Sequence, residues 1–467
     1  MNTLLRRMLP FCSVSVFVGL LVWWMQTAPP TFLERTPEAS AHPVMGDRGP
    51  DRFWEAGRLH RGMGDAVSLP GRWSQFRGAD GTNIVSDRAV KIFEKWGQKE
   101  PRELWSIDVG EGHAGAAIQD GRVYLLDYDR ESRSDVLRCL SLQDGEEIWS
   151  YSYPNRIKRN FGITRTVPAV TDNSVVTIGP KGQVLSLNPL TGAFQWAFNM
   201  PDKWGTEIPK WYMGQCPRIV DGKVILAPGG KVLMAAVDEK DGKVLWETPN
   251  PRNWKITHSS LTIMELDGVK QAVYPSSDGV VSVSVRSGKV LWEHSGWKVR
   301  VSNIPAPVAL PDGRIFFTGG YDSGSMMAKV TRDDKWAVKE LYRLEADVLG
   351  SHIHTPIWYR NLLFGISEDH ELVCLTAEGD EKWRSDKKHR LGLGPFMVVN
   401  DYIFALSEDG VLSLVRVDGS RFDVLTEAQV LTGDDAWAPM AFAGGLLIVR
   451  DTKVMKCLEV GTVDGSK

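Results

Sequence analysis

The feature that most constrains the fold is a short phrase, DGKVLWE at residues 241–247, which recurs along most of the chain with only its polar positions changed. Clear copies are DGEEIWS at residues 144–150, TGAFQWA at 191–197, SGKVLWE at 287–293 and EGDEKWR at 378–384. From Trp105 to Trp292, five successive unit tryptophans are 44 to 50 residues apart. Such a period indicates either four-stranded β-blades or helical repeats.

The residues between the tryptophans favour strands over helices. In residues 222–240, GKVILAPGGKVLMAAVDEK, short apolar runs are broken at short intervals by Gly, Asp or Pro, as in strands joined by hairpins. Each unit is therefore expected to contain four strands, with Gly supplying positive φ at the turns. The Trp at the end of the outermost strand is expected to pack between neighbouring units.

Counting the units predicts an all-β fold, an eight-bladed β-propeller of four-stranded blades closed by an N-terminal strand. Residues 103–109 form an outer strand with no inner strands before it, whereas residues 445–460 supply inner strands with no outer strand after them. The two ends are thus expected to share a blade and to remove its open edge. A seven-bladed ring is the alternative, because the fifth and seventh units have Leu341 and Val424 where the Trp is expected. The complete blades are expected at residues 115–153, 167–199, 216–248, 261–294, 306–344, 355–385 and 394–430.

These repeats resemble those of the quinoprotein-like (PQQ-like repeat) β-propeller family. In addition, WSQFRGADGTNI at residues 73–84 resembles an opening motif of exported members of planctomycete type. This opening does not look like a blade, and its Trp, Phe and Arg are expected to plug one end of the ring. The resemblance covers residues 73–460 and implies a fold rather than an activity, because one propeller serves enzymes and scaffolds alike.

An apolar run at residues 9–25, preceded by Arg6 and Arg7, predicts a transmembrane anchor or an export signal. About 17 helical residues span roughly 26 Å, which is marginal for a bilayer core. The nearest small-residue cleavage sequence, Ala39-Ser40-Ala41, lies well beyond the run, which favours an uncleaved anchor. The arginines favour a cytoplasmic position for residues 1–8. We therefore expect a single-pass protein of the bacterial inner membrane with its propeller in the periplasm, or an exported protein if the signal is cleaved.

Residues 26–71 are rich in Pro, Arg, Glu and Gly and predict a flexible stalk. Phe53, Trp54 and Leu59 leave a short docking segment as the alternative. Residues 72–460 are assigned to the propeller and residues 461–467 to a tail. The formal net charge of −3 gives no bulk electrostatic attraction to nucleic acid, so nucleic acid is not an expected partner.

The five cysteines are scattered along the chain. Three of them are expected at one equivalent position in the third strands of their units: Cys139, Cys374 and Cys457. In other units the same position is expected to hold Ser186, Ala236 and Ser284. A position that accepts Cys, Ser or Ala is a tight packing position, and blades around a ring keep such sulfurs apart, so neither a disulfide nor a metal site is expected. Cys216 is the one candidate for a reactive thiol, with inert burial as the alternative.

The resemblance implies two classes of function. The best-known enzymes of the family are alcohol and sugar dehydrogenases that use pyrroloquinoline quinone (PQQ) and calcium, but this chain has neither the adjacent Cys–Cys pair of the alcohol dehydrogenases nor a haem-binding CxxCH. Calcium needs several converging oxygen ligands, and the candidates show no diagnostic spacing: Glu207, Asn303, Asp434 and Asp435. We therefore expect no cofactor and no enzymatic activity. The other class is the non-catalytic propeller similar to the lipoprotein of the outer-membrane barrel-assembly machinery, which holds partners through its loops.

A binding site is expected where the inner strands begin, because those loops converge on one mouth of a propeller channel. The residues at these positions are His113, Arg165, Trp211, Tyr212, Gln215, His258, Asn303, His352, His354 and Trp437. Imidazole is a common metal ligand and general base, yet opposite blades keep such residues apart, so the histidines are expected to hydrogen-bond loop carbonyls. The aromatic residues favour stacking on a ligand or anchoring a partner.

Together these patterns predict a membrane-tethered binding or scaffolding module of the cell envelope. Its expected partners are envelope proteins or a small ligand at the propeller mouth, and the membrane itself through the N-terminal helix. The alternative is a PQQ-dependent oxidoreductase with calcium.

Overall fold

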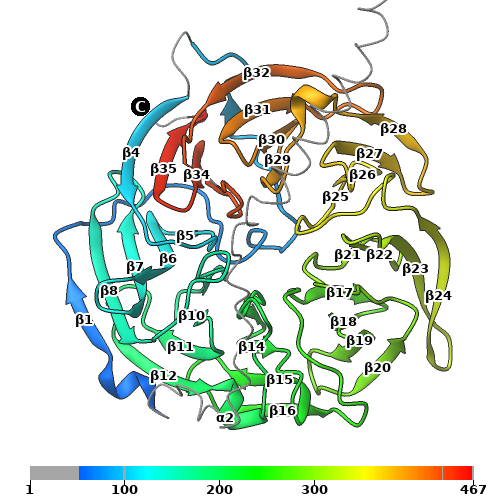
Figure 1. The fold of residues 1–467 in the computed structure, drawn as a ribbon, viewed down its shortest axis with the longest axis horizontal. Helices are drawn as coiled ribbons and strands as arrows, with labels where there is room; N and C mark the ends of the chain where they lie inside the picture. The colour runs from blue at the N-terminus through cyan, green and yellow to red at the C-terminus, as the bar shows by residue number, and fades with distance from the viewer. Residues whose placement is uncertain (1–51, 98–100, 434, 465–467) are drawn as a thin grey trace, which may run out of the picture. The chain divides into compact units, whose positions relative to one another are not determined.

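Eight units of four strands would be too many strands for one open sheet, and the chain instead forms eight blades, each an antiparallel sheet, arranged around a common centre. The computed structural model describes residues 52–97, 101–433 and 435–464, which all belong to one compact unit. Each blade has four strands from the centre to the rim, in chain order in blades 1 to 7, as Figure 1 shows. Residues 58–61 and 84–85 each add a fifth strand, to the sheets of blades 1 and 7. The eight-bladed count is confirmed, and the seven-bladed alternative is wrong.

The first four blades follow one another along the chain. Blade 1 consists of β5 (Ala117–Gln119), β6 (Arg122–Asp129), β7 (Ser134–Ser141) and β8 (Glu147–Pro154). Blade 2 consists of β9 (Ala169–Val170), β10 (Val175–Ile178), β11 (Gln183–Leu187) and β12 (Phe194–Asn199). Blade 3 consists of β13 (Arg218–Val220), β14 (Lys223–Leu226), β15 (Val232–Asp238) and β16 (Val244–Pro249). Blade 4 consists of β17 (Thr262–Leu266), β18 (Val269–Ser276), β19 (Gly279–Ser284) and β20 (Val290–His294).

The next three blades complete the part of the ring that is continuous in sequence. Blade 5 consists of β21 (Val308–Ala309), β22 (Arg314–Gly319), β23 (Gly324–Arg332) and β24 (Trp336–Leu344). Blade 6 consists of β25 (Ile357–Tyr359), β26 (Leu362–Ile366), β27 (Leu372–Thr376) and β28 (Glu381–Arg384). Blade 7 consists of β29 (Phe396–Val399), β30 (Tyr402–Leu406), β31 (Val411–Arg416) and β32 (Val424–Gln429).

Blade 8 joins the two ends of the propeller, as the sequence predicts. Its inner strands are β33 (Ala441–Ala443), β34 (Leu446–Arg450) and β35 (Val454–Glu459), and its outer strand is β4 (Arg102–Asp108). β4 pairs antiparallel with β35, which places Trp105 opposite Cys457. A second pairing follows, because β3 (Val90–Ile92) is antiparallel to β36 (Gly461–Val463). Residues 461–463, which were expected to belong to the tail, thus form a paired strand.

The core of the unit lies in the seams between neighbouring blades. Each hydrophobic cluster combines strands of adjacent sheets; one cluster, for example, contains Trp149 and Leu137 of blade 1 with Val175 and Leu185 of blade 2. The cluster at the closure contains Val123 of blade 1 with residues of blades 7 and 8. Burial of these apolar surfaces is the main favourable contribution to a ring of this kind.

The unit tryptophans lie opposite small residues in the third strands. This confirms the prediction that one equivalent third-strand position holds Cys, Ser or Ala because it is tightly packed. The observed pairs are Trp105 with Cys457, Trp149 with Cys139, Trp196 with Ser186, Trp246 with Ala236, Trp292 with Ser282 and Trp383 with Cys374. Our assignment of Ser284 to this position is wrong, because Ser282, two positions earlier, is the residue that pairs with Trp292.

Five of these six tryptophans also donate a hydrogen bond to the next blade, whereas Trp292 donates to Gln271 of its own blade. The indole Nε1 of Trp196 donates to the carbonyl of Glu239 in blade 3 at 2.8 Å, and a Cβ added to Gly242 of that turn would lie 2.8 Å from the indole. Equivalent donor–acceptor pairs are Trp105 with Leu142, Trp149 with Pro189, Trp246 with Val285 and Trp383 with Asp418. The repeated phrase therefore encodes an inter-blade contact.

The two blades without the tryptophan have other residues at this position. In blade 5, Tyr342 lies opposite Met327, and its hydroxyl donates to the carbonyl of Ala377 in blade 6 at 2.9 Å. In blade 7, Thr426 lies opposite Leu414. The neighbouring blade 8 takes its third and fourth strands from opposite ends of the propeller, so it has no hairpin there for an aromatic residue to cover.

Residues 52–61 lie against blade 1 and do not extend away from it as a stalk. β1 (Arg58–Arg61) adds an antiparallel strand outside β8. Before it, η1 (Phe53–Ala56) buries Phe53, whose ring centroid lies 4.6 Å from that of Tyr153. The docking alternative is thus confirmed for Phe53. The part of the expected stalk at residues 26–51 lies outside the described residues.

Residues 73–85 cross the centre of the ring and form the expected plug. Trp73 bridges Ile118 of blade 1, whereas β2 (Ile84–Val85) runs parallel to β29 of blade 7. Between these contacts, Arg77 Nη2 donates to the carbonyl of Pro356 beside blade 6 at 3.1 Å. The segment therefore closes the centre on the side where the inner strands end.

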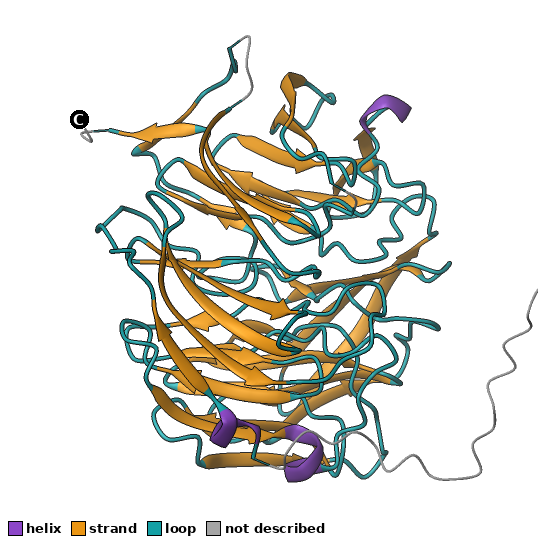
Figure 2. Ribbon diagram, turned by 60° about the vertical axis from the view of Figure 1, so that its left-hand side comes forward, coloured by secondary structure: helices purple, strands orange, loops and turns teal. Residues whose placement is uncertain are grey.

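Helices contribute little, as Figure 2 shows. Besides η1 they are α2 (Met200–Trp204) and η2 (Lys387–His389). Across residues 52–97, 101–433 and 435–464, no helix has the length and apolarity needed to cross a bilayer. The predicted membrane segment at residues 9–25 lies outside these ranges.

Candidate binding site

The loops before the inner strands surround one cavity of about 370 Å³. All eight blades contribute to its wall, and the plug contributes Phe76, Arg77 and Asn83. One residue from each blade, in order, is His113, Arg165, Trp211, His258, Ser302, His354, Leu393 and Trp437. Residues more than 300 positions apart in sequence thus meet at one site, because the ring brings every such loop to the same axis.

Six of the ten predicted site residues line this cavity. They are His113, Arg165, Trp211, His258, His354 and Trp437. Loops from opposite sides of the ring thus border one cavity, to which the plug also contributes. The sequence-based choice of the loops before the inner strands therefore identifies the wall of the cavity.

The other four predicted residues have different partners. Gln215 is fully buried and forms two hydrogen bonds with the backbone of Ala227. The Tyr212 hydroxyl donates to the carbonyl of Lys158 at 2.8 Å. Asn303 is buried but does not line the cavity, although its neighbours in sequence do. His352 Nε2 lies 3.3 Å from the carboxylate of Glu368. Gln215, Tyr212 and His352 therefore contact neighbouring loop residues.

Sequence reasoning missed Phe161 and Tyr321 as lining residues. Phe161 has φ +53° and a side chain that is 67% exposed, and it belongs to the long loop before β9. Tyr321 belongs to the turn between β22 and β23. Because successive strands alternate in direction, this turn lies on the same face as the start of the inner strand. Counting that alternation would have pointed to Tyr321, whereas the position of Phe161 depends on a loop conformation without a sequence signal.

Aromatic rings dominate two sides of the cavity. The rings of His113 and Trp437 are stacked, with centroids 4.7 Å apart and an interplanar angle of 21°. On the second side, the ring centroids of Trp211 and His258 lie 6.0 Å apart, and the ammonium group of Lys210 lies 5.0 Å from the Trp211 ring centroid. Flat side chains of this kind suit a flat or apolar ligand group.

The three histidines of the wall are neutral at pH 7. Burial and the nearby Arg165 lower the pKa of His113 to about 3 and that of His258 to about 4. Burial lowers the pKa of His354 to about 4 as well. His354 Nε2 donates to the carbonyl of Gly394 at 2.7 Å, so this ring has the structural role that we expected for the histidines. A base with so low a pKa is poorly matched to proton abstraction near neutral pH.

Two arginines give the cavity its charge. The Nη atoms of Arg165 donate to loop carbonyls, among them those of Asn160 at 2.8 Å and Phe161 at 2.7 Å. The guanidinium of Arg77 donates to the carbonyls of Thr82 and Pro356. Burial lowers the pKa of Arg165 to about 10 and that of Arg77 to about 9, so both remain charged at pH 7. Carbonyl partners satisfy hydrogen bonds, but neither positive charge has a counter-ion among the described residues.

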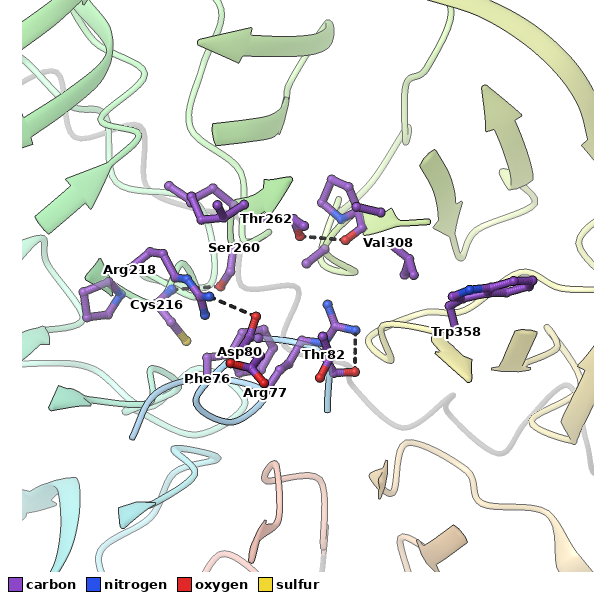
Figure 3. Close-up of a pocket in the computed structure, with 17 residues that line it drawn as sticks. Phe76, Arg77, Asp80, Thr82, Cys216, Arg218, Ser260, Thr262, Val308 and Trp358 are labelled. Carbon is purple, nitrogen blue, oxygen red and sulfur yellow. Dashed lines mark hydrogen bonds between the residues drawn. The ribbon is translucent and has the colours of Figure 1, made fainter. Parts of the chain in front are cut away.

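Below the mouth, the plug and blades 3 to 6 border a smaller cavity of about 90 Å³. Figure 3 shows Arg77 and Asp80 of the plug beside Cys216 and Arg218 of blade 3. Arg218 Nη2 donates to the carbonyl of Asp80 at 3.0 Å. Burial raises the pKa of the Cys216 thiol to about 11, so the thiol stays protonated. Inert burial, rather than reactivity, is thus the environment that the structure gives Cys216.

The wall does not fit the calcium ion that PQQ-dependent dehydrogenases require. Calcium takes six to eight oxygen ligands, usually with several carboxylates, yet no Asp or Glu is among the described residues of the wall. Nor does any group of three His, Cys, Asp or Glu side chains with metal-binding geometry occur in the part of the chain that the structure describes. We therefore derive no dehydrogenase chemistry at this site.

Comparison of the sequence with known protein families tests the family resemblance that the repeats indicated. The family described as outer membrane protein assembly factor BamB matches residues 51–208 and 202–385, which together span more than half of the chain. The chain belongs to this family. A comparison with curated proteins gives no significant match.

Solved structures of similar fold include both function classes. BamB from Moraxella catarrhalis is 14% identical with a TM-score of 0.55, and the match covers 77% of this chain and 99% of that protein. Quinohemoprotein alcohol dehydrogenase from Comamonas testosteroni is 13% identical with a TM-score of 0.59, over 89% of this chain and 83% of the enzyme. The quinohemoprotein alcohol dehydrogenase ADHIIG from Pseudomonas putida HK5 is 12% identical with a TM-score of 0.56, over 85% and 81%. At these identities the similarity concerns the fold.

Proposed function

We propose that this chain is a binding or scaffolding module of the bacterial cell envelope, which holds a partner at the mouth of its propeller. The observation that carries this proposal is the mouth cavity, which all eight blades line with mostly apolar and aromatic side chains and whose described lining residues include no carboxylate for a calcium-dependent quinone site. The family match adds support, because its description names an assembly factor of outer membrane proteins. The exposed side chain of Phe161 at the rim gives a partner an apolar contact.

The proposal includes a membrane tether. The apolar run at residues 9–25 follows two arginines, and the stretch from residue 26 to the docked segment at Phe53 gives the propeller reach. A tethered propeller acts at high effective concentration on partners in or near the same membrane. The proposed location is the periplasmic side of the inner membrane.

Photo-crosslinking in the native host tests partner binding. A photoreactive phenylalanine analogue is placed at Phe161 or, as a matched control, at Phe194 on the outer strand of blade 2, which is 43% exposed. We expect a discrete protein adduct from position 161 that is absent from position 194 and is lost when Trp211→Ala is added. Absence of an adduct, or the same adducts from both positions, would overturn the proposal. So would alcohol- or sugar-dependent dye reduction by the full chain with added PQQ and calcium.

A further inference from the structure

The mouth cavity contains positive charge without negative charge. Arg165 and Arg77 both line it, no Asp or Glu among the described residues does, and neither arginine takes part in an ion pair with any described residue. Arg159, in the same loop as Arg165, is by contrast paired with Glu111. Loop carbonyls accept hydrogen bonds from both guanidinium groups, but only an anion balances a buried positive charge. The wall therefore favours an anionic occupant.

Unpaired polar atoms of the wall indicate which kind of anion. Nε1 of Trp437 and Nε of Arg77 are buried and have no hydrogen-bond partner among the described residues. The rings of His113 and His258 have only weak hydrogen bonds with the backbone carbonyls of Phe161 and Tyr212. The residues His113 and His258 are each 9% exposed. Indole and guanidinium nitrogens are donors only, and a neutral imidazole supplies one donor. This excess of N–H donors calls for a ligand that brings acceptors, as a carboxylate does.

The other residues of the wall indicate that the part of the ligand beyond its anionic group is apolar. Trp211 and the stacked pair of His113 and Trp437 present aromatic surfaces, while Phe76, Phe161 and Ile353 extend the apolar lining. A cavity of about 370 Å³ lies within the range of small-ligand sites. Inorganic anions would leave this apolar surface without contacts.

We propose that the mouth cavity binds an organic carboxylate with an apolar body of at least aromatic size, with its anionic group at Arg165 and its body between Trp211 and the His113–Trp437 pair. The proposal rests on the proposed function and narrows it to one chemistry. That chemistry is shared by a free organic acid and by the C-terminal carboxylate of a polypeptide that ends in an apolar residue.

Calorimetric titration of the full chain in detergent tests the proposal with two matched pairs of probes. Indole-3-acetate and its neutral amide represent a free acid, and acetyl-Leu-Phe and its C-terminal amide represent a polypeptide end. We expect saturable one-to-one binding of at least one acid, with its amide at least tenfold weaker, because charge-assisted hydrogen bonds are roughly twice as strong as neutral ones. If the acid is preferred over its amide in only one of the two pairs, that pair identifies the ligand as a free acid or as a polypeptide end.

Variants distinguish a charge contact from a structural role. Arg165→Gln is expected to weaken the acid to the level of its amide while leaving the amide unchanged, and Arg165→Lys is expected to restore part of the difference. Arg159→Gln, in the same loop, is the control and keeps the full preference. Melting temperatures check that each variant is folded. Equal binding of acid and amide, no binding of any probe, or an unchanged preference in Arg165→Gln would overturn the proposal.

The two proposals fail in different ways. If no probe binds but Phe161 still gives a specific protein adduct, the binding module stands and the carboxylate chemistry is wrong. If carboxylates bind but no adduct forms, the cavity is a small-ligand site and partner binding at the mouth is wrong.

Discussion

At the turn of the repeated phrase, Gly242 has φ +69° and packs against the indole of Trp196 in the preceding blade. Two physical demands thus meet at one residue: a left-handed backbone, which costs other residues about 1–2 kcal/mol, and room for a neighbouring indole. Gly145, Gly192 and Gly288 meet Trp105, Trp149 and Trp246 in the same way. Both the turn and the contact between blades therefore require glycine at the second position of the DG and TG pairs.

A comparison of Gly242→Ala with Gly222→Ala separates the effect of backbone strain from that of the contact with the indole. Gly222 also has φ +69°, but a Cβ there would meet nothing within 4 Å. We expect Gly222→Ala to lower the melting temperature modestly through backbone strain, and Gly242→Ala to lower it further by the equivalent of about 1–3 kcal/mol from overpacking against Trp196. Calorimetric melting of both variants measures the difference, and equal effects would contradict the seam contact.

Among the elements, the segment of η1 and β1 is the one whose attachment depends on few residues. β1 pairs with the exposed edge of β8, and Phe53 is its deeply buried anchor, in contact with Tyr153. Gly62 permits close approach, because a Cβ there would lie 1.7 Å from the carbonyl oxygen of Glu147. The segment covers an edge strand that would otherwise be open to pairing with another chain.

Phe53→Ala is expected to release this segment while the ring stays folded. Loss of the buried ring removes about 3–5 kcal/mol of favourable packing in a well-ordered core, more than one short strand on an edge is expected to withstand. Hydrogen exchange should therefore speed up for residues 58–61 and remain slow in β6 and β7. His60→Gln, at an exposed position of the same strand, is the control. Unchanged exchange in Phe53→Ala would show that strand pairing alone holds the segment.

On the scale of the whole molecule, the ring is closed by the chain's own N-terminal strand, and the mouth cavity exists only because it is closed. β4 completes blade 8, and residues of blades 7, 8 and 1 share one apolar cluster. The plug then separates the mouth from the other side of the ring. The proposed anchor at residues 9–25 would place this closed unit at a membrane surface.

An alkaline carbonate wash of host membranes tests the anchor. An uncleaved apolar helix is expected to keep the full chain in the membrane pellet, because about 17 buried apolar residues hold a helix in a bilayer against changes in pH and salt. A control chain whose residues 1–25 are replaced by a cleavable secretion signal should appear in the supernatant. Release of the natural chain by the wash would instead support a cleaved signal and an exported propeller.

The sequence alone determined the repeat, the eight blades, their closure and the loops that form the mouth, because each of these depends on local turn chemistry and on strand periodicity. Even the substitution of Tyr342 for Trp in blade 5 keeps an aromatic donor, although its register could not be read without the observed pairing. Only the tertiary structure decided which loop residues line the cavity. It separated His354 from His352 and turned Gln215 away, and it placed Arg77 of the plug in the wall of the same cavity as Arg165. The physical reason is that the direction of a loop side chain and the balance of charge in a cavity arise from contacts between blades that are remote in sequence.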